Sequence, residues 1–244
     1  MTTALTIAAP ILMYHRIGAT RSNSIVSGQY VPSDLFEKQL RFLLRRGYSP
    51  VSLSDFVGCL ASPHKGVRPI AITFDDGYES VYTNALPILK RHNVTGTVFV
   101  VAGHVGETND WDEAKGDVTE PMMSLEQIRD AQRLGIEIGS HTSSHPDLLQ
   151  CSPPQAVDEI AGSKRLLEDL LRRPVDWFSY PYGRESEAIR SLVRAAGYLG
   201  ACGTRRSLNT SRTNRYSLAR INMRATTTIP WLIYKLARAR GEMS

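Results

Sequence analysis

Apolar positions along the chain fall into short continuous runs and longer segments with helical spacing, and the two kinds alternate. The short runs predict buried strands at residues 11–14, 69–74, 97–101, 136–139 and 175–180. The helical segments cover residues 35–46, 81–91, 124–135, 155–171 and 187–196. This alternation favours an α/β fold with a mainly parallel sheet, either an open doubly wound sheet or a barrel. No internal repeat or low-complexity linker divides residues 1–244, so a single domain is expected.

Residues that start or interrupt helices refine these boundaries. Ser52 with Asp55, and Ser124 with Gln127, have the spacing of capping boxes at helix N-termini. Pro87 is awkward inside the helical segment that contains it, because proline lacks the N–H that an interior helical position donates. The polar stretch 104–122 predicts a long loop of the kind that often carries binding residues.

The composition is ordinary for a globular protein, with 42% hydrophobic and 22% charged residues among 244. The net charge of +5 is compatible with an anionic polymer or a membrane surface as partner. Nucleic-acid binding normally shows a dense Lys/Arg stripe with a recognisable motif. The sequence has neither, so no nucleic-acid partner is expected.

Cysteine usage and the N-terminus bear on the compartment. Cys59, Cys151 and Cys202 are odd in number and widely spaced, so they form neither a disulfide framework nor a CxxC metal site. Residues 1–16 include an apolar stretch without a preceding basic residue, which favours a first buried strand over a secretory signal. No run approaches the ~18 apolar residues of a membrane span. A cytoplasmic location is therefore predicted.

Two adjacent carboxylates follow the strand at 69–74. Asp75 and Asp76 precede Gly77, which allows a sharp turn. Active sites of parallel α/β folds form where strands end, and burying two carboxylates costs several kcal/mol unless a cation or hydrogen bonds offset it. An Asx turn that caps the next helix explains the same residues equally well.

Two histidines follow the strand at 136–139. His141 and His145 are four residues apart, so their imidazoles can face one ion from a helical turn or a tight loop. Two imidazoles with one carboxylate form a three-ligand site suited to zinc, which leaves positions open for water and substrate. Taken alone, the pair is better explained as surface histidines. Its position at a strand end, after an Asp-Asp turn, favours the metal site.

Two further motifs close strands. Residues 178–183, which include Ser179 and Tyr182, contain a Pro-Tyr-Gly turn that in isolation indicates only a rigid connection. His15 ends the first predicted strand, and a lone histidine there is more often structural than catalytic. Neither motif would indicate a function without the other two.

Taken together, the motifs resemble those of the NodB-type polysaccharide deacetylases, carbohydrate esterase family four, from about Pro69 to Gly200. The resemblance implies a distorted (β/α) barrel and a divalent ion, most often Zn²⁺. It implies that this ion is bound by Asp76, His141 and His145. By the same resemblance Asp75 is the catalytic base, and the backbone N–H of Tyr182 helps to bind the oxyanion.

The sequence departs from the common family pattern in two places. Ser179 stands where most members have the arginine that supports the base, and no histidine follows His145 to serve as general acid. The N-terminal run 12–17 resembles the permuted poly-N-acetylglucosamine deacetylases, in which His15 becomes the acid. Arg220 lies in a C-terminal run that also resembles this branch. It either supports the base or pairs with a surface carboxylate, and the second interpretation is slightly favoured.

The predicted activity is therefore metal-dependent removal of N-acetyl groups from the amino sugars of a polysaccharide. By resemblance, the substrate is a bacterial exopolysaccharide that contains N-acetylglucosamine. Two alternatives stay open: a degenerate module that binds glycan without hydrolysing it, and a hydrolase of a non-sugar amide. The basic, amphipathic segment 230–238 predicts a helix. This helix is expected to pack on the barrel with its arginines in water, and peripheral membrane contact or a homodimer are the alternatives.

Overall fold

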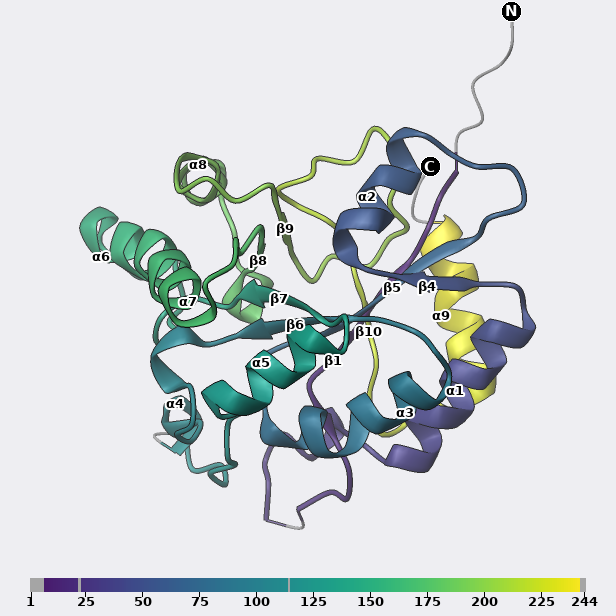
Figure 1. Cartoon of the computed structure of the whole chain (residues 1–244), viewed down its shortest axis with the longest axis horizontal. Helices are drawn as coiled ribbons and strands as arrows, with labels where there is room; N and C mark the ends of the chain where they lie inside the picture. The colour runs from purple at the N-terminus through teal and green to yellow at the C-terminus, as the bar shows by residue number, and fades with distance from the viewer. Residues whose placement is uncertain (1–6, 22, 114, 242–244) are drawn as a thin grey trace, which may run out of the picture.

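The computed structural model describes residues 7–21, 23–113 and 115–241, and a curled parallel sheet forms its centre (Figure 1). The eight-stranded sheet has the order β10-β1-β5-β6-β7-β8-β9, with β4 beside β5. Its strands are β1 (Ile11–Tyr14), β4 (Ser49–Val51), β5 (Pro69–Phe74), β6 (Thr97–Val100), β7 (Glu137–Ser140), β8 (Trp177–Ser179), β9 (Gly200–Cys202) and β10 (Ile221–Asn222). All pairings between these strands are parallel. The predicted α/β fold of the distorted-barrel type is confirmed as a curled half-barrel.

Helices surround the convex side of the sheet, and α2 covers the end where β1 begins (Figure 1). They are α1 (Ser33–Arg45), α2 (Leu53–Ala61), α3 (Leu86–Arg91), α4 (Asp110–Glu113), α5 (Leu125–Arg133), α6 (Pro153–Val157), α7 (Ser163–Leu171), α8 (Glu187–Ala195) and α9 (Ile229–Gly241). A second, small sheet pairs β2 (Arg16–Ile17) with β3 (Tyr30–Val31). Short 3₁₀ segments lie at Ser27–Gln29, Ala102–His104 and Pro181–Gly183.

Strand alternation divides the core into an outer and an inner cluster. On β5, Ile70 and Ile72 pack in the outer cluster under the helices, whereas Ala71 packs in the inner cluster. The inner cluster also contains Phe99, Trp177 and apolar residues of α2. The α2 residues close the end of the curl at which β1 begins. Because successive side chains of a strand point to opposite faces, the inward row of β5 continues through Thr73 to Asp75. The sheet therefore aims Asp75 into the interior of its own curl.

Pro87 is accommodated by a local change of helix type. The segment Val81–Ala85 is a π-helix, and α3 begins directly after it with Pro87 in its first turn. In the first turn of a helix the missing proline N–H leaves no carbonyl without its expected partner. The helix predicted at 81–91 is thus confirmed as two consecutive segments. A second π-helix, Asp158–Gly162, similarly joins α6 to α7 within the helix predicted at 155–171.

The predicted helix starts agree with the structure. Ser124 and Gln127 form a reciprocal capping box, and the Ser52 hydroxyl accepts the Asp55 N–H at 3.0 Å. The described residues of the loop predicted at 104–122 form the short α4 and an isolated bridge between Thr108 and Pro121. The first strand is confirmed as β1, while residues 1–6 of the segment considered as a secretory signal lie outside the described residues.

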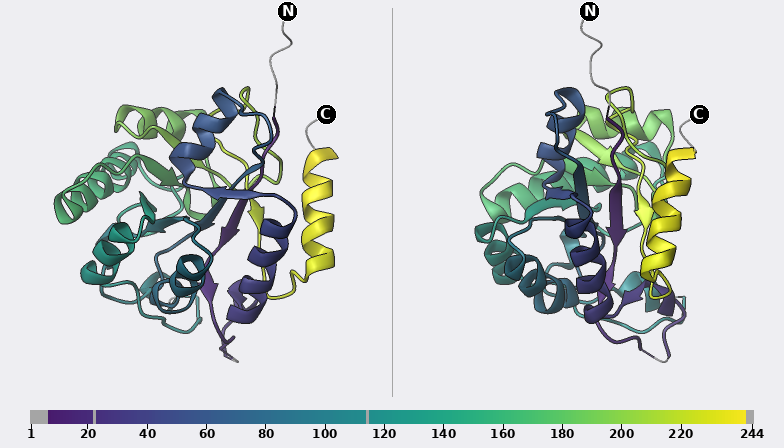
Figure 2. Two further views of the ribbon diagram at one scale, coloured as in Figure 1. Left: turned by 45° about the vertical axis from the view of Figure 1, so that its right-hand side comes forward. Right: turned by 90° about the vertical axis from the view of Figure 1, so that its right-hand side faces the viewer.

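The C-terminal helix α9 packs along the edge of the sheet beside α1 (Figure 2). Leu232, Leu236 and Ala239 are buried against the outer cluster, while Trp231 and Tyr234 are exposed. The expected packing is confirmed, and membrane contact or dimerisation through α9 stays a prediction. Among the described residues, no helix combines the length and apolar character needed to cross a membrane.

Close packing at Gly139 gives a test of the fold. A Cβ at Gly139 would lie 2.5 Å from the Phe99 ring and 2.9 Å from the Trp177 carbonyl oxygen. We expect Gly139→Ala to destabilise the protein by about 1–3 kcal/mol, because buried β7 has no room for a methyl group. Gly58→Ala is the matched control, since a Cβ there meets nothing within 4 Å in α2. It should stabilise by about 0.5–1 kcal/mol. Urea unfolding measures both, and equal midpoints would contradict the packing.

Candidate active site

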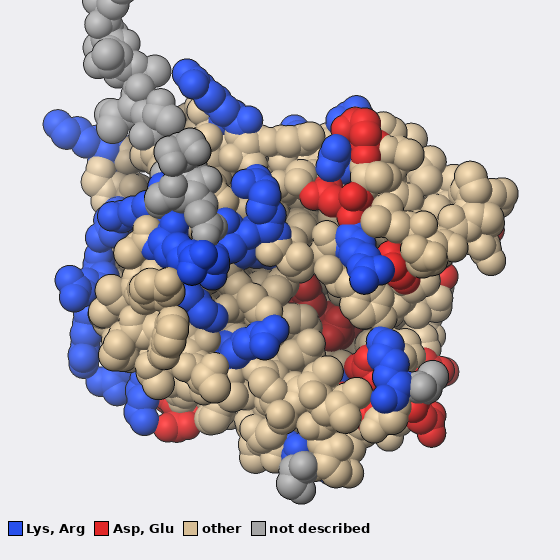
Figure 3. All heavy atoms as spheres, turned by 180° about the vertical axis from the view of Figure 1, so that it is seen from behind, with Lys and Arg blue, Asp and Glu red and all other residues tan. Residues whose placement is uncertain are grey.

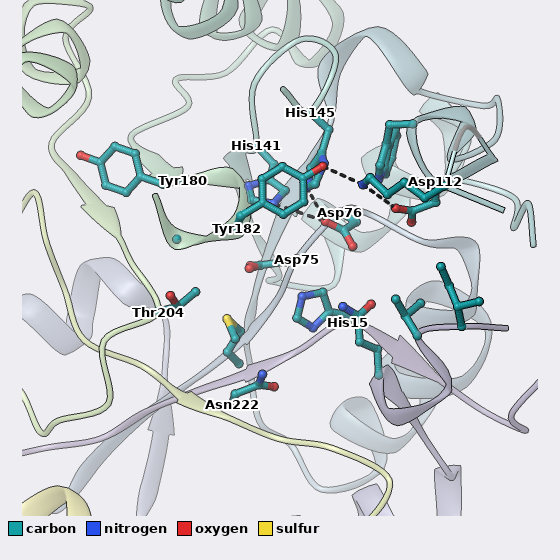
Figure 4. A pocket seen from close by; sticks show the side chains of 17 residues that line it. His15, Asp75, Asp76, Asp112, His141, His145, Tyr180, Tyr182, Thr204 and Asn222 are labelled. Carbon is teal, nitrogen blue, oxygen red and sulfur yellow. Dashed lines mark hydrogen bonds and ion pairs between the residues drawn. The ribbon is translucent and has the colours of Figure 1, made fainter. Parts of the chain in front are cut away.

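Five strands deliver polar side chains to one cavity at the carboxyl edge of the sheet. The cavity has a volume of about 580 Å³, and Figure 4 shows the side chains that line it. Asp75 and Asp76 follow β5, His141 follows β7, and the Pro181–Gly183 turn follows β8. His15, after β1, and Asn222, from β10, complete the opposite wall. All the site residues predicted from sequence therefore line one cavity.

Asp76, His141 and His145 form a compact, buried donor set. Asp76 Oδ1 lies 3.3 Å from His141 Nε2 and 3.4 Å from His145 Nε2, and the three donor atoms lie within 4.8 Å of one another. Ligand bonds of about 2.0–2.1 Å in a tetrahedron give ligand–ligand edges of about 3.3–3.4 Å. Two imidazoles and one carboxylate are also a donor set that zinc prefers. The residues present therefore fit a divalent ion such as Zn²⁺.

A strained, hydrogen-bonded loop holds the two histidines. Thr142 and His145 have positive φ values of 70° and 60°, which non-glycine residues rarely adopt. The Thr142 hydroxyl accepts the His145 N–H at 2.9 Å, and the Glu159 carboxylate accepts the N–H groups of Ser143 and Ser144, each at 2.9 Å. Such strain persists only where the surroundings over-determine it. These contacts allow His145 to face back toward His141.

Hydrogen bonding fixes which ring nitrogen of His141 faces Asp76. His141 Nδ1 lies 2.7 Å from the Ser179 carbonyl oxygen, so Nδ1 donates to that carbonyl and Nε2 is the ring nitrogen that faces Asp76. His145 is held differently. Its ring stacks on the Trp111 ring, with 4.8 Å between the ring centroids and an interplanar angle of 25°. The Nδ1 atom of His145 has no hydrogen-bond partner among the described residues.

The charges in this cluster are tightly coupled. Burial alone would raise the pKa of Asp76, but hydrogen bonds with His141 and His145 hold it well below its ordinary value. Burial would lower the pKa of His141, yet the hydrogen bond with Asp76 and the charge of Asp75 raise it. For His145 burial prevails and lowers the pKa. The carboxylate is therefore ionised, as a metal ligand must be.

Arg220 corrects the sequence interpretation. Pairing with a surface carboxylate was slightly favoured, but Arg220 is 0% exposed and binds both oxygens of Asp75, at 2.6 and 2.7 Å. Its guanidinium also donates to Ser179 Oγ at 2.9 Å and to the Gly203 carbonyl oxygen at 2.8 Å. Arg220 directly precedes β10, so it reaches Asp75 from a different strand than Ser179, which ends β8. The position vacated at Ser179 is thus filled by a guanidinium from elsewhere in the chain.

This pair keeps Asp75 charged in a buried place. Burial alone would raise the pKa of Asp75, but the charge of Arg220, and then that of His141, lower it below its ordinary value. The bidentate geometry is the strong form of an arginine–carboxylate contact. Asp75 therefore stays ionised and fixed in orientation beside the Asp76 cluster, and in that state it can accept a proton.

His15 lies across the cavity from the other two histidines. Figure 4 shows it on the side of Asp75 and Asp76 that faces away from His141 and His145. Burial lowers the pKa of His15 below its ordinary value, although both carboxylates oppose the shift. Its Nδ1 is buried and has no partner among the described residues. A ring that exchanges protons easily thus faces the cavity beside two negative charges.

Residues of the 104–122 loop, which was predicted to be of the kind that often carries binding residues, form the rim of the cavity. Trp111 packs on His145, and Lys115 Nζ donates to the Tyr182 hydroxyl at 2.9 Å. Tyr182 has a φ of 59° and is 47% exposed. Its ring and that of His145 are roughly perpendicular, with 4.9 Å between their centroids. Trp111 could have been noticed in the sequence because it is a large aromatic residue in an otherwise polar stretch.

A buried arginine ties this loop to the strand that follows His15. Arg16 is 1% exposed, and its guanidinium lies over two tyrosine rings. The Cζ atom is 4.3 Å from the ring centroid of Tyr78 and 5.0 Å from that of Tyr30. It also pairs with Asp112 at 3.3 Å and Asp117 at 3.6 Å, both in the loop. Because a buried charge needs such partners, Arg16 joins β2, the turn after Asp76 and the rim.

Fold and site together define a class of protein: an α/β domain that gathers two carboxylates, three histidines and a donor set fitting a divalent ion at the carboxyl edge of a parallel sheet. A family model described as "Polysaccharide deacetylase" matches residues 63–201. YxkH of Bacillus subtilis (strain 168), which is named for the same family, is 30% identical over 215 residues, covering 88% of this chain and 71% of YxkH. The chain belongs to the polysaccharide deacetylase family, and relatives named as N-deacetylases place it among the hydrolases of amide bonds in polysaccharides.

Two further relatives support this placement. The poly-beta-1,6-N-acetyl-D-glucosamine N-deacetylase of Staphylococcus aureus is 24% identical over 233 residues, which cover 88% of this chain and 78% of that enzyme. The structure of the Streptococcus pyogenes deacetylase PplD in complex with acetate matches with a TM-score of 0.79 and 26% identity. That match covers 95% of this chain and 99% of PplD. The resemblance found from sequence motifs is confirmed, and the permuted arrangement with His15 is consistent with these relatives.

The Arg220–Asp75 pair leads to a prediction about stability and pH in metal-free protein. Arg220→Met leaves a buried carboxylate unpaired, which should cost about 3–5 kcal/mol near neutral pH. In the wild type, the lowered pKa of Asp75 contributes stability above its ordinary value of 3.8, and this is lost as pH falls through the folded-state pKa. In the variant, burial raises the pKa of Asp75, so stability instead falls as pH rises above 3.8.

Chemical unfolding from about pH 2 to pH 7 measures both slopes, because the wild-type loss lies below 3.8 and the loss in the variant lies above it. The double variant Asp75→Asn/Arg220→Met is the control, because it removes both charges and with them the pH dependence of this pair. A single variant whose stability rises with pH as steeply as that of the wild type would contradict the buried pairing.

Proposed function

We propose that this protein is a metal-dependent N-deacetylase that removes acetyl groups from the amino sugars of a polysaccharide. The observation that carries the proposal is the donor set of Asp76, His141 and His145 beside a separate, ionised Asp75. A site that only bound metal would have no use for a second carboxylate held by a buried arginine. A carboxylate next to the ion but outside its donor set is the arrangement that a general base requires.

The proposed roles follow from position. Asp76, His141 and His145 would hold the divalent ion, most often Zn²⁺, which supplies Lewis-acid polarisation of a carbonyl and a lowered pKa for water. Asp75 would accept the proton of the attacking water, with Arg220 keeping it ionised and oriented. The backbone N–H of Tyr182 would donate to the oxyanion that develops on the acetyl oxygen.

His15 would act as the general acid. The leaving group of an amide is an amine anion, which is far too basic to depart unless it is protonated. His15 lies across the cavity from the donor set, where a sugar amine could lie between them (Figure 4). Because burial lowers the pKa of His15, the neighbouring carboxylates are needed to favour its protonated form. The proposed deacetylation thus uses His15 as an acid in addition to the two histidines that would bind the ion.

The substrate class rests on the cavity and on likeness. The cavity opens to solvent, and its rim carries the aromatic rings of Trp111 and Tyr182. Sugar rings commonly pack on such aromatic surfaces because both faces are partly apolar. The staphylococcal relative acts, by its name, on poly-beta-1,6-N-acetyl-D-glucosamine. We therefore propose an exopolysaccharide that contains N-acetylglucosamine as the substrate of this chain as well.

Two alternatives have weaker support. A degenerate glycan-binding module was suggested by the missing arginine at Ser179, but Arg220 now fills that place beside Asp75. A binder would also need neither a base nor an acid. Hydrolysis of a non-sugar amide uses the same groups and differs only in the rim. Acetate release from N-acetylglucosamine oligomers, with and without chelator, separates all three functions.

Replacing the base gives the first functional test. We expect Asp75→Asn to reduce acetate release to background, because the amide side chain cannot accept the water proton. Metal content, measured by mass spectrometry after dialysis, should stay close to one ion per chain, whereas His141→Ala should lose the ion. Retained turnover in Asp75→Asn would refute its role as base.

Comparing two leaving groups tests the acid. His15→Ala should slow hydrolysis of an N-acetylglucosamine oligomer by about 10²–10⁴-fold, the usual effect of removing general acid catalysis. The loss should be much smaller for an activated aryl acetate, whose leaving group needs no proton. Equal losses on both substrates would assign His15 to binding or structure instead.

A further inference from the structure

One wall of the cavity is backed by basic residues. Thr204 and Asn222 line the cavity, and the chain continues from them into the exposed Arg205 and Arg224. Figure 3 shows a central hollow with acidic atoms at its base, basic side chains gathered on one side, and mixed charges on the other. The charge around the cavity is therefore asymmetric.

Lys235 of α9 contacts the backbone of this wall of the cavity. Its Nζ donates to the Asn222 carbonyl oxygen at 2.5 Å and to Thr227 Oγ1 at 3.0 Å. Thr227 Oγ1 also accepts the Arg224 N–H at 3.0 Å, so the turn between these residues folds around the ammonium group. Burial lowers the pKa of Lys235, and the positive charges of Arg224 and Arg206 lower it further. The lysine thus lies in a positive local field.

Arg224 brings this charge to the rim. Its side chain crosses Gly28, where a Cβ would lie 4.0 Å from both Arg224 Cδ and Nη1, and the next residue, Gln29, lines the cavity. Within the described parts of the chain, no carboxylate forms an ion pair with Arg224 or Lys235. Around the same mouth, Arg21 pairs with Glu120 at 2.9 Å and Arg184 pairs with Asp147. Arg21 and Arg184 are thus neutralised by carboxylates, whereas Arg224 and Lys235 have no such ion pair among the residues that the structure describes.

We infer that Arg205, Arg224 and Lys235 form a subsite for a negatively charged group, a carboxylate or a phosphate, carried by the glycan. The inference rests on the proposed deacetylase function, because it places this group on the same chain as the sugar in the cavity. Asn222 joins the two sites directly, since its side chain lines the cavity and its carbonyl oxygen binds Lys235. An anion there would neutralise clustered cations and steer an acidic polymer into the cavity.

Paired oligosaccharides test the subsite. N-acetylglucosamine oligomers that carry O-carboxymethyl groups are compared with oligomers of equal size that carry neutral O-hydroxyethyl groups. We expect wild-type kcat/KM to be about tenfold higher for the anionic oligomer at low salt, and the preference to vanish near ~0.5 M salt, where charges are screened. Arg224→Gln and Arg205→Gln should each remove about two- to fivefold of this preference and leave the neutral oligomer unaffected.

Arg173→Gln is the matched control, because it removes the same charge from an exposed site before β8, at the opposite end of the sheet. It should retain the preference. An absent preference, or equal losses in all three variants, would overturn the subsite and leave the deacetylase function untouched. Arg224-dependent binding to anionic phospholipid vesicles, without preference between oligomers, would also overturn it in favour of a lipid surface.

Binding measured without turnover separates the subsite from the deacetylase function. Calorimetry with the inactive Asp75→Asn variant should give tighter binding of the anionic oligomer, and Arg224→Gln in that background should abolish the difference. If no oligomer releases acetate but this difference persists, the subsite stands and the proposed deacetylation fails.

Discussion

The contact between Arg220 and Asp75 is the constraint on which the site depends. Both side chains are buried, and an isolated charge at either position would be strongly unfavourable. Strands β5 and β10 lie on either side of β1. The pair therefore requires Asp75, at the end of β5, and Arg220, just before β10, to keep their register relative to β1. Thr73 and Ser179 add hydrogen bonds that satisfy the remaining guanidinium protons. Architecture and proposed chemistry meet at this one ion pair.

Strain and close packing surround this pair. Asp76, His145 and Tyr182 adopt positive φ values of 74°, 60° and 59°, although none is a glycine. Each such conformation costs about 1–3 kcal/mol and is retained where the surroundings hold it. The Glu159 carboxylate and the Trp111 ring provide part of this support for His145. These contacts thus hold the proposed ligands in their orientations, and such support from surrounding residues is what a well-ordered donor set requires.

Sequence alone predicted what is local. Asp75, Asp76 and His141 come at strand ends and His145 lies in the loop just after, so strand prediction and parallel topology were enough to bring them to one edge. The place of Arg220 could not be predicted, because it depends on a contact with a residue 145 positions away in the sequence. Trp111 and Lys115 were missed for a similar reason, since a polar loop has no periodicity that shows which side chains face the cavity. The π-helix before Pro87 is a local adjustment that spacing does not reveal.

The pairing of β1 with β10 has a consequence for biosynthesis. The strand before His15 is made long before its neighbour in the sheet, which spans Ile221–Asn222. At about 5–20 residues per second, β1 waits roughly ten seconds or more for the partner that covers its edge. An uncovered strand edge is prone to pairing with other chains. The site can therefore be completed only after β10 has emerged from the ribosome, because only then can Arg220 meet Asp75.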